Sequence, residues 1–309
     1  MKSPLDYRLG FLIPVLLVCF CLVGAGGTCW AQPVHAVWKP LIDRLAKDGV
    51  AGAEVSALFA TLPAHPTQSP MGRKIRDLYN KKFFPKPPPK LTDYYPGVVN
   101  MANAARCQNY LAAHKASFER AYERYGVEPE IAVALLFVET RLGDVLADVP
   151  ENAFYTLASM ALARTPDDIA SYLPKMKGSS RRLAWITKTM QPKADWAYAE
   201  VKALIVYMLA NGIAPDAMPS SIYGAVGLCQ FMPSNIAIYG ADGNGDGRID
   251  LFQIDDATAS LANYLAKHGW KKGLPRERQH ALLMKYNHAK IYANTILALS
   301  DLVAAKSPR

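Results

Sequence analysis

Hydrophobic residues recur along most of the chain at the three- and four-residue spacing of helices, and the densest stretch lies between Ile131 and Val138. Every residue of that stretch is apolar, a pattern typical of a helix that is buried on nearly all sides. Pro129 suits the first turn of a helix, and Gly143 suits its end. The pattern therefore predicts a buried helix over residues 129–143.

Glu139 follows this apolar stretch and shares a helical face with Ala132, Leu135 and Leu136. A carboxyl group that lies over apolar surface loses hydration, which raises its pKa and favours the protonated form. A general acid that works near neutral pH needs this property. The alternative is an ordinary ion pair between Glu139 and a cation such as Arg141 at the helix end.

The rest of the chain also favours helices, and no window alternates in the manner of a strand, so we predict an all-α fold with at most a short β-hairpin. Residues 34–60 indicate two short helices that are separated near Gly49 and Gly52. Residues 61–100 carry many prolines and aromatic residues but little periodicity, and they predict an ordered wrap over the main body. Residues 153–164 are small and apolar, and further helices are expected over residues 99–125, 195–211, 256–269, 275–286 and 292–305.

Residues 1–31 have the pattern of a signal peptide. Lys2 and Arg8 precede an apolar run over residues 11–23, and the small side chains of Cys29 and Ala31 fit cleavage after residue 31. The run is shorter than the roughly 20 residues that a membrane-spanning helix needs. We therefore expect export to the periplasm. An outer-membrane lipoprotein is the alternative, although the residues before Cys29 fit a lipidation signal poorly.

The chain is basic, with a formal net charge of +9 at pH 7. A basic exported protein is attracted to anionic envelope polymers and membrane surfaces. Export and the lack of a dense Lys/Arg stripe argue against nucleic acid as a partner. After the signal peptide the cysteines are Cys107 and Cys229, which form one disulfide or stay as two free thiols.

A second candidate motif spans residues 221–234, with the sequence SIYGAVGLCQFMPS. Gly224 and Gly227 allow another part of the protein or a ligand to approach the backbone closely. Gln230 lies in a mostly apolar loop, where its amide can donate to and accept from a sugar hydroxyl or an N-acetyl group. The alternative is a tight turn before a helix that begins near Ser234.

A third candidate motif pairs Tyr286 and Asn287 with Tyr292. Aromatic faces stack on sugar rings, and an amide can orient a carbonyl group. The alternative is a pair of aromatic core residues near a helix end.

The fourth motif, over residues 242–253, follows the pattern of a calcium-binding loop. Position 12 of this pattern is Gln253 instead of glutamate, so a closing carboxylate must come from Asp250, Asp255 or Asp256. The alternative is an Asp/Gly-rich turn without a metal. The other oxygen donors are the side chains of Asp242, Asn244 and Asp246 and the backbone carbonyl of Arg248.

These four motifs, in this order, resemble those of the lytic murein transglycosylases of the membrane-bound type B family. The matching segments are VETRLG around Glu139, GAVGLCQFMPS, DGNGDGRIDLFQIDDATASLANYL and YNHAKIY. The resemblance extends from about residue 34 to residue 303. The chain departs from the family's pattern at Leu142, Cys229 and Ala289, which affects the details of the groove but not the acid.

The resemblance implies a lysozyme-like catalytic domain over residues 101–309, preceded by a helical segment and proline-rich wrap over residues 32–100. It implies that Glu139 is the catalytic residue and that an EF-hand-like loop binds a structural Ca²⁺ with Asp256 as the closing ligand. By the same resemblance, the residues that line the glycan groove are Ser221, Gln230, Tyr264, Tyr286, Asn287 and Tyr292.

The resemblance also implies the reaction. Glu139 would protonate the oxygen between N-acetylmuramic acid and N-acetylglucosamine and then remove the proton of the muramic acid 6-hydroxyl, giving a 1,6-anhydro sugar. A glycosidase ordinarily uses two carboxylates, for which Asp144 and Asp148 are the nearest candidates in sequence. The alternatives are a lysozyme-type hydrolase and a non-catalytic peptidoglycan-binding scaffold. We expect a monomer that binds peptidoglycan strands.

Overall fold

The computed structural model describes residues 33–87, 92–173 and 180–305, which all belong to one compact unit. The predicted signal peptide, residues 1–31, lies outside the described residues. None of the helices in the described part of the chain is long and apolar enough to cross a membrane. The boundary between the N-terminal segment and the catalytic domain, expected between residues 100 and 101, stays a prediction.

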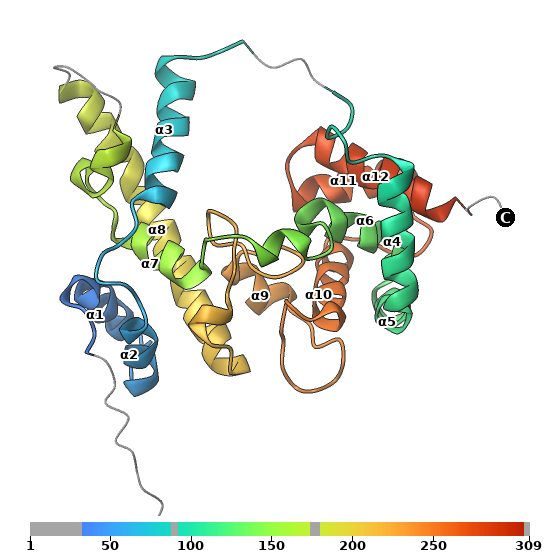
Figure 1. Cartoon of the computed structure of the whole chain (residues 1–309), viewed down its shortest axis with the longest axis horizontal. Coiled ribbons are helices and arrows are strands. Elements are labelled where there is room, and N and C mark those ends of the chain that lie inside the picture. The colour runs from blue at the N-terminus through green and yellow to red at the C-terminus, as the bar shows by residue number, and fades with distance from the viewer. Residues whose placement is uncertain (1–32, 88–91, 174–179, 306–309) are drawn as a thin grey trace, which may run out of the picture. The chain divides into compact units, whose positions relative to one another are not determined.

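The described residues form helices joined by loops, with isolated β-bridges and no β-strand, as the all-α prediction requires (Figure 1). Short 3-10 helices cover Ala36–Trp38 (η1), Asp144–Ala147 (η2), Pro166–Tyr172 (η3) and Pro215–Ala217 (η4). The α-helices are α1 (Lys39–Lys47), α2 (Ala53–Ala60), α3 (Ser69–Phe83), α4 (Met101–Ala113), α5 (Lys115–Tyr125), α6 (Pro129–Thr140), α7 (Ala153–Leu162), α8 (Ser180–Asn211), α9 (Pro233–Tyr239), α10 (Ile254–Lys267), α11 (Arg276–Tyr286) and α12 (Lys290–Ala304).

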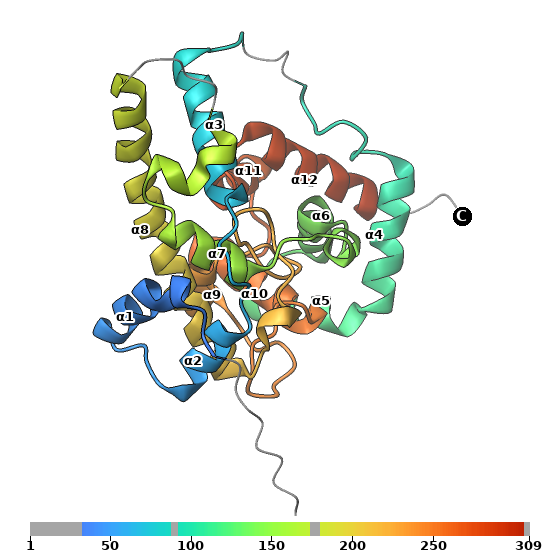
Figure 2. The same ribbon diagram turned by 60° about the vertical axis from the view of Figure 1, so that its left-hand side comes forward.

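Helix α6 lies at the centre of one group of helices. Its residues from Ile131 to Phe137 are all buried, as the apolar stretch predicts. It packs against α4, α5, α10 and α12, and α12 and α4 lie on two sides of it in Figure 2. The helix ends at Thr140, because Arg141, Leu142 and Gly143 all adopt positive φ angles.

A second group of helices is formed by α1, α3, α7 and α8. Helix α7 packs along α8, and α3 packs against α7, α8 and η3 (Figure 1). Gly72 permits the close approach of α3 and η3, because a Cβ atom at this position would overlap the ring of Tyr172. This contact places the first turn of α3 beside the end of η3.

The predicted irregular wrap over residues 61–100 is wrong for residues 69–83, which form α3. Met71, Ile75 and Tyr79 are spaced four residues apart and are buried on one face of this helix. Pro70 lies in the first turn of α3, where its missing N–H would have had no helical partner. The proline that suggested irregular structure therefore marks the start of a helix.

The long helix α8 begins at Ser180, fifteen residues before the predicted start at residue 195. Pro192 lies inside this helix, although a proline within a helix removes a backbone hydrogen bond. Ile186 and Met190 are fully buried on the segment before the proline. Their packing stabilises a helical segment that Pro192 alone would predict to be interrupted.

Cys107 and Cys229 are free thiols, and both are buried. Burial raises the pKa of the Cys107 thiol to about 12 and raises the pKa of Cys229 as well. Of the two alternatives, the structure contains the pair of free thiols. Because neither thiol ionises near neutral pH, neither acts as a nucleophile there.

Candidate active site

Glu139 lies in the last turn of α6, at the wall of a pocket of about 360 Å³. The Glu139 side chain is half-buried and lines this pocket. Burial raises the pKa of Glu139 from its ordinary value of 4.5 to about 7, and a hydrogen bond from Tyr292 acts in the opposite direction. The carboxyl group can therefore hold a proton at neutral pH and lose it again without a large change in free energy.

Tyr292 and Tyr286 support this carboxyl group from the side of the core. Tyr292 of α12 is only 2% exposed, and its hydroxyl donates a hydrogen bond of 2.5 Å to Oε1 of Glu139. The ring of Tyr286 is nearly parallel to that of Tyr292, at an angle of 12°. The hydroxyl of Tyr286 donates to the backbone carbonyl of Cys229 at 2.5 Å. The two tyrosines thus connect α11 and α12 to Glu139 and to the loop that carries Gln230.

Arg141 does not neutralise Glu139. Its guanidinium lies over the ring of Phe137, 5.0 Å from the ring centroid, and among the described residues it forms no ion pair with Glu139. The backbone of Arg141 has a φ of 55°, which directs the chain away from the helix axis after Thr140. The ordinary ion-pair alternative for Glu139 is therefore not what the structure contains.

The segment around Gln230 forms a compact turn next to the end of α6. The hydroxyl of Thr140 donates to the carbonyl of Leu228 at 3.1 Å. The backbone of Gln230 has a φ of 52°, and its Nε2 donates to the carbonyl of Gly227 at 2.9 Å. A Cβ atom on Gly227 would overlap Leu251, so this glycine allows the close backbone approach that its position predicts.

The pocket brings together three of the predicted site residues, Glu139, Ser221 and Gln230. It also contains two charged residues that the sequence did not indicate, Arg73 and Glu151. No helix was predicted where Arg73 lies, and Glu151 lies in a loop without a motif. The other lining residues are Thr140, Val145, Leu146, Val149, Ser220 and Ile222.

The other residues predicted for the glycan groove do not line this pocket. Tyr264 of α10 contacts the rings of Phe231 and Tyr286, and its hydroxyl donates to the carbonyl of Lys285 at 2.8 Å. Asn287 is exposed directly after α11. Tyr264 therefore supports Tyr286, whereas Asn287 is accessible to a ligand.

Neither nearby aspartate supplies a second carboxylate to the pocket. Asp144 is exposed and forms an ion pair with Arg106 at 2.6 Å. Asp148 is also exposed and does not line the pocket. Glu151 is the acidic residue that lines the pocket together with Glu139.

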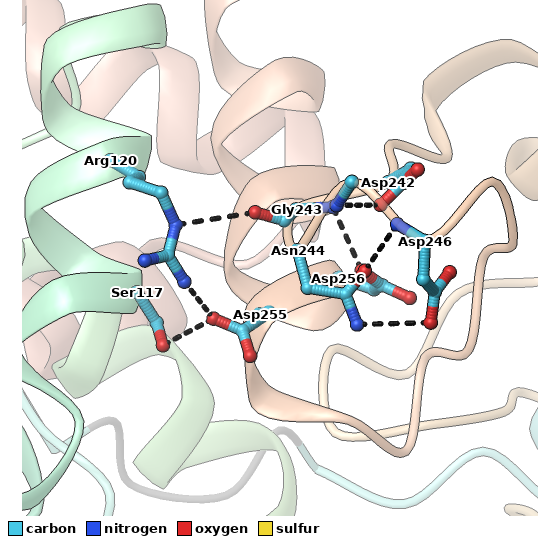
Figure 3. Close-up of polar contacts among 9 residues, drawn as sticks. Ser117, Arg120, Asp242, Gly243, Asn244, Asp246, Asp255 and Asp256 are labelled. Carbon is cyan, nitrogen blue, oxygen red and sulfur yellow. Dashed lines mark hydrogen bonds and ion pairs between the residues drawn. The ribbon is translucent and has the colours of Figure 1, made fainter. Parts of the chain in front are cut away.

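The predicted calcium ligands lie around one loop (Figure 3). The carboxylate of Asp242 accepts hydrogen bonds from the backbone N–H groups of Gly245 and Gly247. The carboxylate of Asp256 is buried and accepts from Gly243 and Asp250 at 2.8 and 2.7 Å. The side-chain oxygens of Asn244 and Asp246 likewise accept from backbone N–H groups of the loop.

The donor chemistry of this loop fits a hard cation such as Ca²⁺. Burial raises the pKa of Asp256, and the negative charges of Asp242 and Asp246 raise it further, so these three carboxylates repel one another. In the described part of the chain, however, no three His, Cys, Asp or Glu side chains are already arranged to hold a metal ion. The loop supplies suitable oxygen atoms, while its carboxylates are hydrogen-bonded to its own backbone.

The carboxylate of Asp256 accepts hydrogen bonds from the loop, whereas the carboxylate of Asp255 contacts side chains of α5. Oδ1 of Asp255 accepts a hydrogen bond from the hydroxyl of Ser117 at 2.5 Å and forms an ion pair with Arg120 (Figure 3). Arg120 also donates to the carbonyl of Gly243 at 3.3 Å. Asp255 thus connects α5 to α10. Of the other two candidates, Asp250 accepts from the backbone N–H of Phe252, and Asp256 accepts from two N–H groups of the loop.

The sequence over residues 33–281 matches the family described as the transglycosylase SLT domain. The chain belongs to this transglycosylase family. The family that the four motifs indicate is thereby confirmed. Within this transglycosylase, Glu139 has the burial and the pKa that an acid catalyst needs.

A curated relative of this transglycosylase is the membrane-bound lytic murein transglycosylase B of Escherichia coli K12. It is 29% identical over 213 residues, which are 69% of this chain and 46% of the relative. The chain therefore spans about half the length of that protein.

Solved structures confirm the lysozyme-like fold of the transglycosylase. SltB3 of Pseudomonas aeruginosa, in complex with NAG-anhNAM-pentapeptide, superimposes with a TM-score of 0.66 at 19% identity, covering 89% of this chain and 80% of that one. The soluble lytic transglycosylase SltB1 of the same organism gives 0.65 at 20% identity, covering 87% and 98%. Escherichia coli Slt35, in complex with calcium, gives 0.61 at 18% identity, covering 87% and 93%.

Proposed function

We propose that this protein is a lytic transglycosylase that cleaves the β-1,4 bond between N-acetylmuramic acid and N-acetylglucosamine in peptidoglycan. The product would carry a 1,6-anhydro-N-acetylmuramic acid end. The observation that carries this proposal is a carboxyl group, Glu139, with a pKa of about 7 in a pocket that it shares with Gln230 and Ser221. The Escherichia coli relative is named a lytic murein transglycosylase, and SltB3 was solved with an anhydro-sugar ligand.

In the first step, protonated Glu139 donates its proton to the glycosidic oxygen while the bond from this oxygen to the anomeric carbon breaks. The substrate's own N-acetyl carbonyl stabilises the positive charge that develops at that carbon. The N-acetylglucosamine side leaves with a new hydroxyl, and Glu139 becomes a carboxylate. The hydrogen bond from Tyr292 stabilises this carboxylate.

In the second step, the carboxylate of Glu139 removes the proton of the muramic acid 6-hydroxyl. The oxygen of that hydroxyl forms a bond to the anomeric carbon, which closes the 1,6-anhydro ring. Glu139 is protonated again, and no water is consumed. Because one residue serves first as acid and then as base, its pKa has to lie near the working pH.

We also propose that the protein works as a monomer in the periplasm, after export by residues 1–31. The relative named above is membrane-bound, so outer-membrane association is an alternative to a soluble form. We further propose that the loop at residues 242–256 binds Ca²⁺, since Slt35 was solved with calcium. The ligands would be Asp242, Asn244, Asp246, the carbonyl of Arg248 and Asp256. Bound calcium would hold the loop and α10 together and would supply no reacting group.

Replacement of the acid tests the proposed reaction. Glu139→Gln keeps the shape of the side chain but cannot transfer a proton, so formation of anhydro ends from purified sacculi should fall below detection. Mass spectrometry of the soluble muropeptides measures these ends. A Glu139→Gln variant with wild-type activity would refute the assignment, and products with reducing ends instead of anhydro ends would favour the hydrolase.

The thermal stability of the same variant shows whether it is folded. Burial raises the pKa of Glu139 in the folded state, so this carboxyl group stabilises the fold fully below about pH 4.5 and loses that contribution as the pH rises through about 7. The amide of Glu139→Gln does not ionise. Above pH 7 the variant should therefore be more stable than wild type, by on the order of 3 kcal/mol, and near pH 4 the difference should be small.

Glu151 is the observation that favours a second candidate function, a lysozyme-type hydrolase with two carboxylates. In that mechanism Glu151 would activate water or attack the sugar. The same product analysis separates the two functions, because hydrolysis leaves a reducing sugar. The non-catalytic scaffold predicts that neither kind of end is formed.

A further inference from the structure

Helix α3 brings basic side chains to the edge of the catalytic pocket. Arg73 is exposed and lines the pocket. The ammonium group of Lys74 lies 4.6 Å from the ring centroid of Tyr223, and the guanidinium of Arg76 lies 5.8 Å from that of Tyr172. Tyr223 directly follows residues 220–222, which form part of the pocket wall. Arg73, Lys74 and Arg76 thus form a cationic edge beside the proposed acid.

Contacts with η3 hold the cationic edge in place. Tyr172 packs against Gly72, and its hydroxyl interacts with the side chains of Ser69 and Arg73. The hydrogen bond from Ser69 lowers the pKa of Tyr172 most, and the charges of Arg73 and Arg76 lower it further. A hydrogen bond with Tyr172 therefore holds Arg73 on the side of η3, while its exposed side chain also lines the pocket.

The positive charge of this edge is only partly balanced by the protein. Within residues 33–87, 92–173 and 180–305, none of the three cations forms an ion pair with a carboxylate. The charge of Asp77 raises the pKa of Tyr223, whereas the charges of Arg73 and Arg76 lower it, so Asp77 lies near the same ring. Glu151 lines the same pocket as Arg73. While Glu139 is protonated, as the proposed first step requires, the three cations outnumber these two acidic residues, so the edge favours an anionic ligand.

A second pocket lies beside the catalytic pocket, at the first turn of α3. This second pocket, of about 150 Å³, shares Glu151 and Ile222 with the catalytic pocket. Ser69 and Pro70 of α3 line it, together with polar side chains such as Asn152. Because the two pockets share part of their walls, the second pocket is the nearest space for a substituent of a sugar bound beside the cationic edge.

The sugar rings of peptidoglycan carry no positive or negative charge at the bond that is cleaved, so they do not account for a cationic edge. The muramic acid does carry anionic groups: its lactyl side chain ends in a carboxylate, or in a peptide stem that bears several carboxylates. A guanidinium binds a carboxylate through two parallel hydrogen bonds. A peptide stem, unlike the short lactyl group, is long enough to enter the second pocket.

We propose that Arg73, with Lys74 beside it, binds a carboxylate of the peptide stem and makes the enzyme prefer stem-bearing glycan. This inference rests on the proposed transglycosylase function. Arg73 acts on substrate selection and takes no part in proton transfer. Its loss should affect the rate on stem-bearing strands much more than the rate on strands without stems.

The test compares two soluble substrates: glycan strands with pentapeptide stems, and the same strands after an amidase has removed the stems and left the lactyl carboxylate. The value of kcat/KM for anhydro-end formation is measured for wild type, Arg73→Ala, Arg73→Lys and a control, Arg278→Ala. Arg278 is exposed on α11 and lines neither pocket. Thermal unfolding of each variant checks that it is folded.

Wild type should prefer the stem-bearing strands, and Arg73→Ala should lower kcat/KM on them by roughly tenfold while changing the stripped strands less than about twofold. Arg73→Lys should recover part of the loss, and Arg278→Ala should match wild type. Equal losses on both substrates would assign the contact to the lactyl carboxylate or to the fold and would overturn the proposal. An Arg73→Ala variant whose kcat/KM matches wild type on both substrates would overturn it as well. If wild type forms anhydro ends from neither substrate, the proposed function itself fails.

Discussion

At the scale of single residues, the proposed chemistry depends on two opposing effects on the pKa of Glu139. Burial at the end of α6 raises its pKa, and the hydrogen bond from Tyr292 limits that rise to about 7. A carboxyl group buried without this hydrogen bond would be a good proton donor, but its carboxylate would be costly to form. The tyrosine therefore matters most in the second step, in which Glu139 has to be charged before it acts as a base.

Tyr292→Phe should shift the pH dependence of the enzyme upward. Without the hydroxyl, the pKa of Glu139 rises, so the protonated acid persists to higher pH and the alkaline limb of kcat/KM moves to higher pH. The maximal rate should fall about tenfold, since a charge-assisted hydrogen bond to the carboxylate is lost. A pH–rate profile of anhydro-end formation measures both effects.

The matched control is Tyr286→Phe. It removes a hydroxyl that donates to the carbonyl of Cys229 and not to Glu139. Its alkaline limb should therefore coincide with that of wild type. If Tyr292→Phe leaves the limb in place, or moves it to lower pH, the role assigned to Tyr292 is wrong.

The sequence indicated the surroundings of a residue where the signal was local. Glu139 follows an apolar stretch, and Gln230 lies between glycines and a proline, so their neighbours in sequence already indicate the environment that the structure shows. Arg73 and Glu151 gave no such signal. Both are charged residues in polar segments, and only tertiary contacts bring them to the pocket.

At the scale of elements, proline was the main source of error. Pro70 lies in the first turn of α3, although the prolines of this region suggested irregular structure, and Pro192 lies inside α8, whose first fifteen residues were not predicted as helix. A proline in the first turn of a helix loses no backbone hydrogen bond. Pro192 does remove one, and the burial of Ile186 and Met190 compensates for its loss. Local propensity alone therefore misplaced the helix that carries the cationic edge.

The predicted calcium loop has the sequence pattern of a metal site, but its conformation does not gather the ligands around one point. Asp242, Asn244 and Asp246 have the expected spacing, but their oxygens accept hydrogen bonds from the loop's own backbone. Such bonds order the loop and leave the repulsion between Asp256 and its neighbours in place. A cation would relieve this repulsion, which is why we expect calcium to stabilise the protein.

Removal of calcium should lower the thermal stability. With free Ca²⁺ at about 100 times its Kd, bound metal stabilises the fold by about 2.7 kcal/mol, equivalent to roughly 5 °C in Tm for a chain of this size. Differential scanning calorimetry with excess Ca²⁺ and with EGTA measures the difference. Asp256→Asn should abolish most of it, because it removes the charge of the closing carboxylate.

Asp216→Asn is the control for this experiment, since it removes an exposed carboxylate outside the loop. Its Ca²⁺-dependent difference in Tm should equal that of wild type. The same Tm for the wild-type protein in Ca²⁺ and in EGTA would rule out a structural calcium ion at this loop.

At the scale of the whole molecule, the pocket is assembled from segments that lie far apart in sequence. Arg73 comes from α3, Glu139 from α6, and Ser221 and Gln230 from the loops between α8 and α9. The all-α class and the order of the motifs were predictable, because periodicity and motifs are local properties. The set of residues that line the pocket was not predictable, because it depends on how α3 and α6 pack against the remaining helices.

The net charge of +9 leads to a prediction for the intact molecule. Sacculi are anionic, so a basic protein should bind them partly through long-range attraction that salt screens. With the Glu139→Gln variant, which should bind without cleaving, the affinity for purified sacculi should fall at least tenfold between about 50 mM and 500 mM NaCl. Co-sedimentation measures it. Binding to chitin, whose sugars are uncharged, should change little over the same range. Equal salt dependence for both polymers would contradict an electrostatic contribution, and it would also weaken the case for a carboxylate contact at Arg73.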